Sequence, residues 1–193
     1  MMQQKIQSLI QASVDIKTQL LQNEALLQTI QKVVEVMINA FKNGNHVYFC
    51  GNGGSAADAQ HLAAEFSGRF YKNRKALPAE ALHCNTSYLT AVANDFSFDV
   101  IYSRMIDGLG KNGDVLVGLS TSGNSLNIVQ ALEMARSKNM VTIGFTGITG
   151  GEMKPFSDYL LNAPGTDTPR IQECHMLMGH IICQLVEENY FED

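Results

Sequence analysis

The sequence lacks both a long hydrophobic run and a concentration of basic residues. No stretch of about 18 uncharged apolar residues occurs, and the first residues, MMQQKIQSLIQASVDIK, contain no continuous apolar core of the kind that a signal peptide needs. The 14 Lys and Arg residues are scattered and are outnumbered by 19 Asp and Glu residues, which gives a net charge of −5. We therefore expect a cytoplasmic protein that crosses no membrane and binds no nucleic acid.

Cysteine and proline are also scarce. The cysteines lie in apolar or helical-looking segments without CxxC spacing, which favours reduced, packed thiols over disulfides or a thiolate metal site: Cys50, Cys84, Cys174 and Cys183. With 193 residues and four prolines, the chain is long enough for one sizeable core and short for two domains. We expect one domain over residues 1–193, with helices in 1–43 and an α/β core in 44–193.

Residues 23–41 have the pattern of an amphipathic helix. Apolar side chains recur at helical spacing from Leu26 to Phe41, Asn23 is suited to cap the helix, and Gly44 is suited to stop it. A weaker helical pattern precedes this segment. Such a pair of helices either covers a sheet or packs against another subunit, and the pattern leaves both alternatives open.

From Asn45 onward, short apolar runs alternate with helical patterns. The runs are HVYFCG, AEALHC, DVLVGLS, MVTIGFTG and YLLNAP, and the helical patterns fall at 55–70, 87–94, 125–138 and 169–190. This alternation predicts a parallel sheet with helices on both faces. Ligands bind such sheets at the carboxyl ends of the strands, so the loops there are the candidate binding sites.

The first of these loops is rich in glycine. Gly51, Gly53 and Gly54 follow an apolar run and precede a helix, so they allow a tight turn and a close approach of a ligand to the backbone. Ser55, with Asp58 three residues later, is predicted to cap the helix, whose positive end would attract an anion. The loop matches neither GxGxxG nor a Walker sequence, and alone it suits a structural turn as well as a ligand site.

A second loop, in DVLVGLSTSGNS, carries several hydroxyl groups at the end of another strand. Backbone amides at the start of a helix accompany the side chains of Ser120, Thr121, Ser122 and Ser125. Serine and glycine are also common in ordinary loops. Because neither loop contains lysine or arginine, hydroxyls and amides would have to hold a phosphate, as is typical for sugar phosphates rather than nucleoside triphosphates.

His61 and Glu65 lie four residues apart on the helix that follows the glycine-rich loop. This spacing places them on one face, about 6 Å apart, where they can share a metal ion, a proton path or only a surface contact. The last helix, with Thr168 as the expected cap and Pro169 as its first residue, adds further candidates: Gln172, Glu173, His175 and His180. His180 lies in an apolar stretch, where a hydrogen-bonded core histidine is the alternative.

Four segments together resemble the phosphoheptose isomerases, the sedoheptulose 7-phosphate isomerase family within the sugar isomerase (SIS) fold. They are CGNGGSAADAQHLAAEFSGRF, ANDFSFD, GLSTSGNS and RIQECHMLMGH, and the match runs in order from residue 44 to 190. The resemblance implies a three-layer α/β fold with a five-stranded parallel sheet flanked by helices, in a subunit of a homotetramer. It also implies conversion of sedoheptulose 7-phosphate to D-glycero-D-manno-heptose 7-phosphate through an enediol, the first step of nucleotide-activated heptose biosynthesis for lipopolysaccharide or capsule.

The resemblance also implies roles for individual residues. Glu65 would be the catalytic base, and His180 would handle the second proton. One zinc ion per subunit would be bound by His61, Glu65, Gln172 and His180. The substrate contacts, which include Glu65 and Gln172 as well, would be Asn52, Gly53, Gly54, Ser55, Asn94, Asp95, Ser120, Thr121, Ser122 and Ser125.

Four other positions stand apart from this assignment. Pro169 occupies a position where some relatives carry an acidic residue, and Asp167 is the nearby residue that would substitute for it. His83 and His175 are expected to be structural.

Helix geometry bears on the implied metal ligands. Gln172 and His180 are eight residues apart, which separates their backbones by about 12 Å along the helix axis and about 80° around it. One ion would bind both only at full stretch, so we predict that a neighbouring subunit supplies at least one of them and that the active site lies at an interface. A glutamate that binds zinc is a poorer base than a free one. Either Glu65 is released from the zinc when substrate binds, or the zinc is bound in only one state of the site.

Two other functions are also compatible with these residues. The first is a non-enzymatic SIS module that binds another protein; the resemblance implies that such binders lack the acid and the histidine at positions 65 and 180, and this chain retains both. The second is an isomerase of another sugar phosphate, such as a pentose or hexose phosphate, because the shared loops would bind any phosphate.

Overall fold

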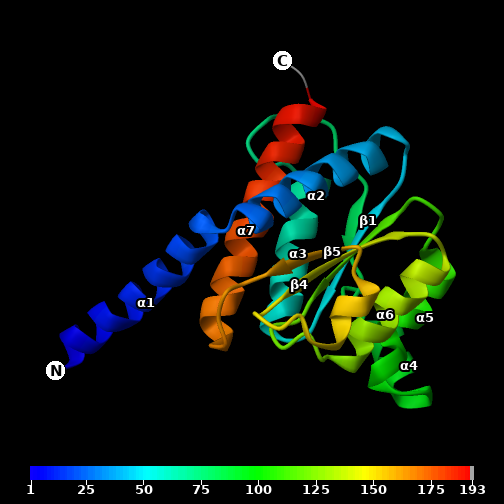
Figure 1. Ribbon diagram of the computed structural model, residues 1–193. Helices are drawn as coiled ribbons and strands as arrows, with labels where there is room; N and C mark the ends of the chain where they lie inside the picture. The colour runs from blue at the N-terminus through cyan, green and yellow to red at the C-terminus, as the bar shows by residue number, and fades with distance from the viewer. Residues whose placement is uncertain (192–193) are drawn as a thin grey trace.

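Two N-terminal helices precede the sheet in the computed structural model, which describes residues 1–191. α1 (Met2–Gln22) projects from the body of the molecule, whereas α2 (Glu24–Lys42) packs against the C-terminal helix (Figure 1). The side chain of Asn23 caps α2 by accepting a hydrogen bond from the Leu26 N–H at 3.1 Å, as predicted. None of the helices within residues 1–191 has both the length and the apolar character needed to cross a membrane.

Five parallel strands form the central sheet in the order β2-β1-β3-β4-β5. They are β1 (Val47–Gly51), β2 (Ala79–Ala81), β3 (Val115–Leu119), β4 (Val141–Thr146) and β5 (Tyr159–Asn162). Gly51 of β1 is level with Leu119 of β3, so these neighbouring strands end together. The glycine-rich loop and the hydroxyl-rich loop therefore begin at the same edge of the sheet.

Helices cover both faces of this sheet, which confirms the predicted three-layer α/β fold. On one face, α2, α3 (Gly54–Ser67) and α7 (Thr168–Tyr190) pack on strand residues such as Val47 and Phe49. On the other face, α5 (Ile101–Leu109) and α6 (Leu126–Ser137) pack on Tyr48 and Cys50. Alternate residues of β1 thus point to opposite buried faces, which explains its uninterrupted apolar sequence.

Three short elements connect these layers. They are α4 (Thr86–Asp95) after β2, the 3₁₀ helix η1 (Phe98–Val100) before α5, and the 3₁₀ helix η2 (Gly151–Phe156) before β5. The sequence patterns did not predict α5, η1 or η2.

Two helix starts and one cysteine differ from the sequence-based expectation. α3 begins at Gly54 with Gly53 as its N-cap at a φ of 55°, which glycine adopts readily, so Ser55 is not the cap and is buried in the first turn. α7 begins at Thr168 with Asp167 as its N-cap, so the prediction was one residue late. All four cysteines are free, as expected, but Cys84 is exposed rather than packed.

Gly51 is the residue at which α3 meets the sheet. A Cβ atom at this position would lie 2.3 Å from the backbone oxygen of Ser55. That oxygen belongs to the first turn of α3, so no side-chain rotation can relieve the clash. The bare backbone of Gly51 therefore allows the helix to start directly against the end of β1.

Replacing Gly51 with Ala is expected to lower the free energy of unfolding by about 1–3 kcal/mol, because the new methyl group overpacks this junction. Gly108 in α5 is the matched control, since no atom lies within 4 Å of the position that its Cβ would take. Gly108→Ala should be neutral or stabilising by up to about 1 kcal/mol, because glycine is the poorer helix former. Urea unfolding of both variants measures the difference, and equal stabilities would contradict this account.

Candidate active site

The glycine-rich loop lies beside Gln172, near the amino end of α7. A Cβ atom at Gly54 would lie 2.5 Å from Nε2 of Gln172, so the glycine leaves room for that side chain. The hydroxyl of Tyr102 in α5 donates to the backbone oxygen of Gly51 at 2.6 Å. These contacts hold the backbone of the loop in place while Gly53 and Gly54 stay exposed to an incoming ligand.

A pair of asparagines joins the glycine-rich loop to the hydroxyl-rich loop. The side-chain amides of Asn52 and Asn127 exchange two hydrogen bonds, each of 2.9 Å. Asn127 is buried in the first turn of α6. Sequence reasoning selected Asn52 but missed Asn127, whose signal would have been a buried amide immediately after the STSGNS motif.

The hydroxyl-rich loop gathers three serine side chains at the amino end of α6. Oγ of Ser120 lies 2.9 Å from Oγ of Ser125 and 3.4 Å from Oγ of Ser122. Ser125 is the N-cap residue of α6, yet its hydroxyl makes no capping hydrogen bond and is left for other partners. Thr121 is half-buried in the same loop. Hydroxyls and the amino end of a helix form a site suited to an anion.

His61, Glu65 and His180 form a compact group, which we call the titratable trio. Nε2 of His61 lies 3.0 Å from Oε1 of Glu65 and 3.2 Å from Nε2 of His180. The potential ligand atoms of the three side chains all lie within 4.8 Å of one another. A cleft of about 510 Å³ opens on this face of α3 and is lined by His61, Glu65 and their neighbours Ala57, Gln60 and Ala64.

The side-by-side packing of α3 and α7 brings the trio together. Gly179 lies so close to Leu62 that a Cβ atom would be 2.6 Å from a methyl group of Leu62. The next residue, His180, then meets His61 across the helix pair. His180 is half-buried, so the alternative of a core histidine at this position is wrong.

Gln172 lies at the other end of this helix pair. It contacts Gly54, whereas His180 contacts His61, and these two residues of α3 are about 10 Å apart along the helix. Within one chain, Gln172 therefore belongs with the glycine-rich loop rather than with the trio.

Asn94 and Asp95, the expected sugar contacts, occupy the last turn of α4. Both are exposed, and the Asn94 amide donates to the Asp95 carboxylate at 2.9 Å. Within residues 1–191, no hydrogen bond or ion pair joins this pair to the two loops or to the trio. These two side chains are therefore not bonded directly to the other candidates.

The other candidates on α7 have structural partners. His175 is completely buried and its Nε2 atom lies 3.0 Å from the Thr146 backbone oxygen, while burial lowers its pKa to about 4. Glu173 receives a hydrogen bond from Ser13 of α1; although burial opposes ionisation, this bond and the charges of Arg170 and Lys17 lower its pKa. Both side chains stabilise the fold.

Asp167 and His83 also lie outside the trio. The Asp167 carboxylate lies 3.9 Å from the Arg170 guanidinium. His83 is half-buried just after β2, and burial lowers its pKa.

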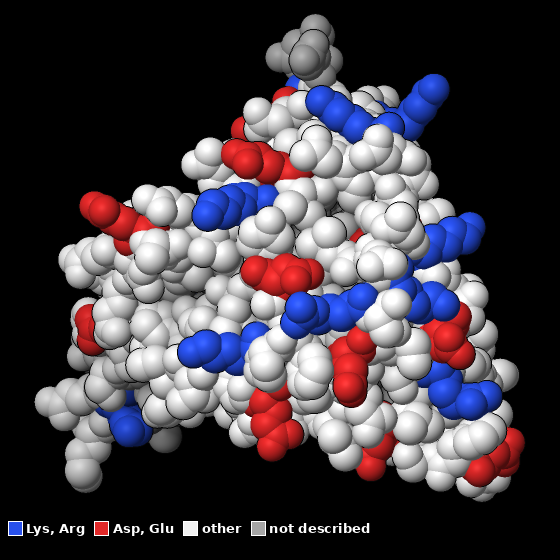
Figure 2. All heavy atoms as spheres, turned by 45° about the vertical axis from the view of Figure 1, so that its right-hand side comes forward, with Lys and Arg blue, Asp and Glu red and all other residues white. Residues whose placement is uncertain are grey.

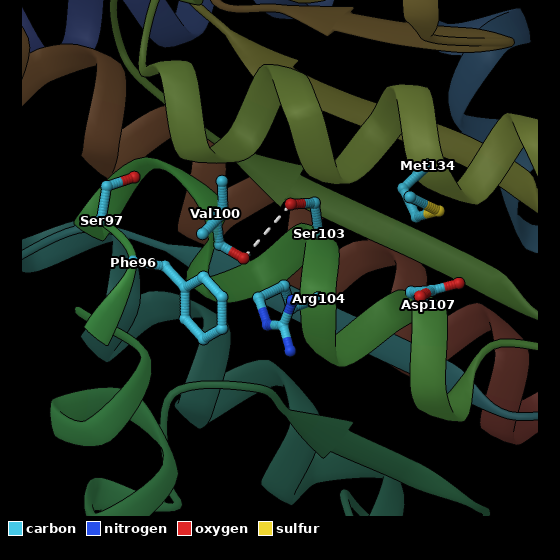
Figure 3. A pocket seen from close by; sticks show the side chains of 7 residues that line it. All are labelled: Phe96, Ser97, Val100, Ser103, Arg104, Asp107 and Met134. Carbon is cyan, nitrogen blue, oxygen red and sulfur yellow. Dashed lines mark hydrogen bonds between the residues drawn. The ribbon is translucent and has the colours of Figure 1, made fainter. Parts of the chain in front are cut away.

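A second cleft, of about 480 Å³, lies between α5 and α6 and contains no part of the trio. Its main feature is the guanidinium of Arg104, which stacks over the Phe96 ring at 4.0 Å from the ring centre (Figure 3).

Figure 2 shows one face of the molecule, on which basic and acidic side chains are interspersed. That face therefore offers no continuous basic surface to a polyanion.

Comparisons with known proteins agree with the sequence motifs. The model of the SIS domain family matches residues 10–147. Phosphoheptose isomerase from Aneurinibacillus thermoaerophilus is 48% identical over 188 residues, which are 97% of this chain and 95% of that protein. Phosphoheptose isomerase from Clostridium acetobutylicum is 49% identical over 186 residues, 96% of this chain and 95% of that protein.

The fold matches a solved structure over nearly the whole chain. Phosphoheptose isomerase from Neisseria gonorrhoeae superimposes with a TM-score of 0.91 at 39% identity, covering 97% of this chain and 99% of that one. Identity and coverage of this extent, on a chain that carries the glycine-rich loop, the hydroxyl-rich loop and the trio, show that the chain belongs to the phosphoheptose isomerase family of SIS-domain proteins.

Proposed function

We propose that this protein isomerises sedoheptulose 7-phosphate to D-glycero-D-manno-heptose 7-phosphate, the first step of nucleotide-activated heptose biosynthesis. The names of its relatives support this assignment. The observation that carries it is the trio, in which a carboxylate and two imidazoles converge within 4.8 Å, in a chain that also has a hydroxyl-rich anion site at the start of α6. An aldose–ketose isomerase needs this combination of a base, a second proton carrier and a phosphate anchor.

Substrate phosphate and substrate carbons would bind to different loops. The phosphate would accept hydrogen bonds from the hydroxyls of Ser120, Ser122 and Ser125, with Thr121 beside them, and from the amides at the start of α6. The sugar chain would extend across Asn52, Gly53, Gly54 and Ser55, with Gln172 at its side. Asn94 and Asp95 would supply the remaining hydroxyl contacts.

The reaction transfers one proton between adjacent carbons. Glu65 would take a proton from C1 of the ketose, which produces an enediol, and return a proton to C2 to form the aldose. His180 would move the second proton between the oxygens on C1 and C2. Since His61 lies 3.0 Å from Glu65 and 3.2 Å from His180, both imidazoles would be close to the negative charge that develops on those oxygens.

The trio also fits a zinc site. Two imidazole nitrogens and one carboxylate oxygen within 4.8 Å of one another are the donor types that zinc prefers. We infer that His61, Glu65 and His180 hold one zinc ion per subunit, with Gln172 as a further ligand. When bound, the ion would polarise the substrate oxygens.

A homotetramer would account for the position of Gln172. Within one chain this side chain lies beside Gly54 rather than in the trio, so a second copy would bring it to the metal. An apolar groove between α2 and α7, lined by Leu27, Ile30, Ile181 and Leu185 among others, supports such an assembly. We place the enzyme in the cytoplasm because four unpaired cysteines suit a reducing compartment.

An isomerase of another sugar phosphate is the remaining alternative, because the anion site would accept any phosphate. A purely protein-binding module is less well supported, since the chain keeps the acid and both imidazoles of the trio.

Glu65→Gln should reduce the conversion of sedoheptulose 7-phosphate by at least about 100-fold, because it removes the base. Uptake of deuterium from the solvent at C2 should fall in parallel. Glu188→Gln is the matched control: it removes an exposed carboxylate on α7 that, among residues 1–191, is hydrogen-bonded through its side chain to the Gln184 amide, and it should leave turnover unchanged. Absence of turnover by the unaltered protein with zinc supplied would instead redirect the search to other sugar phosphates and to protein partners.

Ser125→Ala should raise KM by about 10-fold or more with a smaller effect on kcat, because it removes a hydrogen bond to a charged phosphate. Ser137→Ala, at the other end of α6, removes an exposed hydroxyl that bonds within its own helix and should change neither constant. Steady-state kinetics on both variants separates the two effects. Equal KM values for both would argue against phosphate binding at this loop.

Zinc content should follow the oligomeric state. We expect one zinc per subunit in the assembled protein and a loss of zinc after His61→Ala, because this substitution removes one ligand of the trio. Sedimentation combined with elemental analysis measures both quantities. A monomer with full zinc content and full activity would rule out a site shared between subunits.

A further inference from the structure

Glu187 is a buried carboxylate that the proposed reaction does not use. It lies on α7, seven residues or about two helical turns beyond His180, and its side chain is 1% exposed. Its oxygens accept hydrogen bonds from the backbone N–H groups of Phe70, Tyr71 and Lys72 at 3.0, 2.6 and 2.8 Å. Burial opposes ionisation, but these three bonds and one from Arg74 lower the pKa, so the group is charged at neutral pH.

Arg74 connects this carboxylate to the end of α3. Its Nε atom donates to Glu187 at 2.8 Å, and its side chain is 3% exposed. The rest of the guanidinium donates to backbone oxygens, including those of Glu65 and Phe66, each at 2.7 Å. These oxygens belong to the last turns of α3, where carbonyl groups lack partners within the helix.

The ion pair thus reaches both helices that carry the trio. Through Arg74 it holds the backbone of Glu65 itself. Through Glu187 it fixes the segment 70–72, in which the Phe70 ring lies 5.8 Å from the His180 ring. No other ion pair within residues 1–191 joins α7 to α3 or to the segment that follows α3.

We propose that Glu187 and Arg74 are positioning residues, which set the placement of Glu65 relative to His180 and so hold the trio in its reactive arrangement. This inference rests on the proposed isomerase function for its kinetic consequence. Removal of one member of a buried ion pair leaves an uncompensated charge and lets the last turn of α3 move away from α7. Proton transfer is sensitive to such shifts, because a misplacement of about 1 Å can cost about 100-fold in rate.

Asp114 provides the matched control. This carboxylate is also 1% exposed, and it accepts hydrogen bonds from the backbone N–H groups of His46 and Lys111, both at 2.9 Å. It precedes β3, and the hydrogen bonds to its carboxylate come from residues outside α3 and α7. Asp114→Asn therefore removes a similar buried charge that anchors a loop, without touching either helix of the trio.

The kinetic test compares Glu187→Gln with Asp114→Asn at a temperature where both are folded. We expect kcat to fall by about 10- to 100-fold in Glu187→Gln while KM stays within about threefold, because the phosphate site lies on β3 and α6. Asp114→Asn should keep its kcat despite a comparable loss of stability. Arg74→Lys retains the positive charge but not the several N–H donors of the guanidinium, so it should show a smaller fall in kcat. This variant takes the place of Glu187→Gln if the latter does not fold.

The second measurement does not depend on turnover. The imidazole NMR signals of His61 and His180 should shift in Glu187→Gln, or in Arg74→Lys if the former does not fold, and should stay in place in Asp114→Asn. Unchanged signals, or equal changes in the control, would overturn the positioning role even if the unaltered protein proved inactive on sedoheptulose 7-phosphate. Shifted signals with an unchanged kcat would overturn it as well.

Discussion

The close packing of α3 against α7 is the constraint on which the candidate site depends. Two glycines permit it: Gly179 makes room for Leu62, and Gly54 makes room for Gln172. A side chain at Gly179 would push the two helices apart, because protein interiors leave no spare volume of that size, whereas one at Gly54 would displace the end of the Gln172 side chain. At the distance that the glycines set, His61 and His180 are within hydrogen-bond reach of each other.

The parallel sheet supplies the second part of the site without any basic side chain in its loops. β1 and β3 are neighbours with level ends, so the amino ends of α3 and α6 lie close together. The Asn52–Asn127 pair then joins the two loops. Amides and hydroxyls bind a phosphate with fixed geometry. The side chains of the trio are then not needed to hold the phosphate and can transfer protons.

The sequence was sufficient to predict the sheet, the long helices and the placement of both loops. These features depend on local patterns, namely the apolar run of β1, the helical pattern at 55–70 and the glycine and serine motifs of the loops. The meeting of His61 with His180 was not predictable from the residues alone, because it depends on lateral packing between helices far apart in the chain. The ion pair between Arg74 and Glu187 was not predictable for the same reason. In the sequence both resemble ordinary charged surface residues, whereas in the fold both side chains are buried. Ser55 was wrongly taken as a cap because a positive φ at Gly53 starts the helix earlier than the capping pattern suggests.

The trio is open to solvent and lies near exposed apolar residues of α7. The side chain of His61 is 50% exposed, whereas an enediol and the base that forms it react best where bulk water is excluded. Leu177 and Ile181, on either side of His180 in the sequence of α7, are each 36% exposed. A second copy packed over these residues would bury apolar surface and close the cleft at the same time. Assembly and water exclusion would then be one event, which gives a physical reason for an isomerase of this fold to keep its reactive side chains near an uncovered helix face.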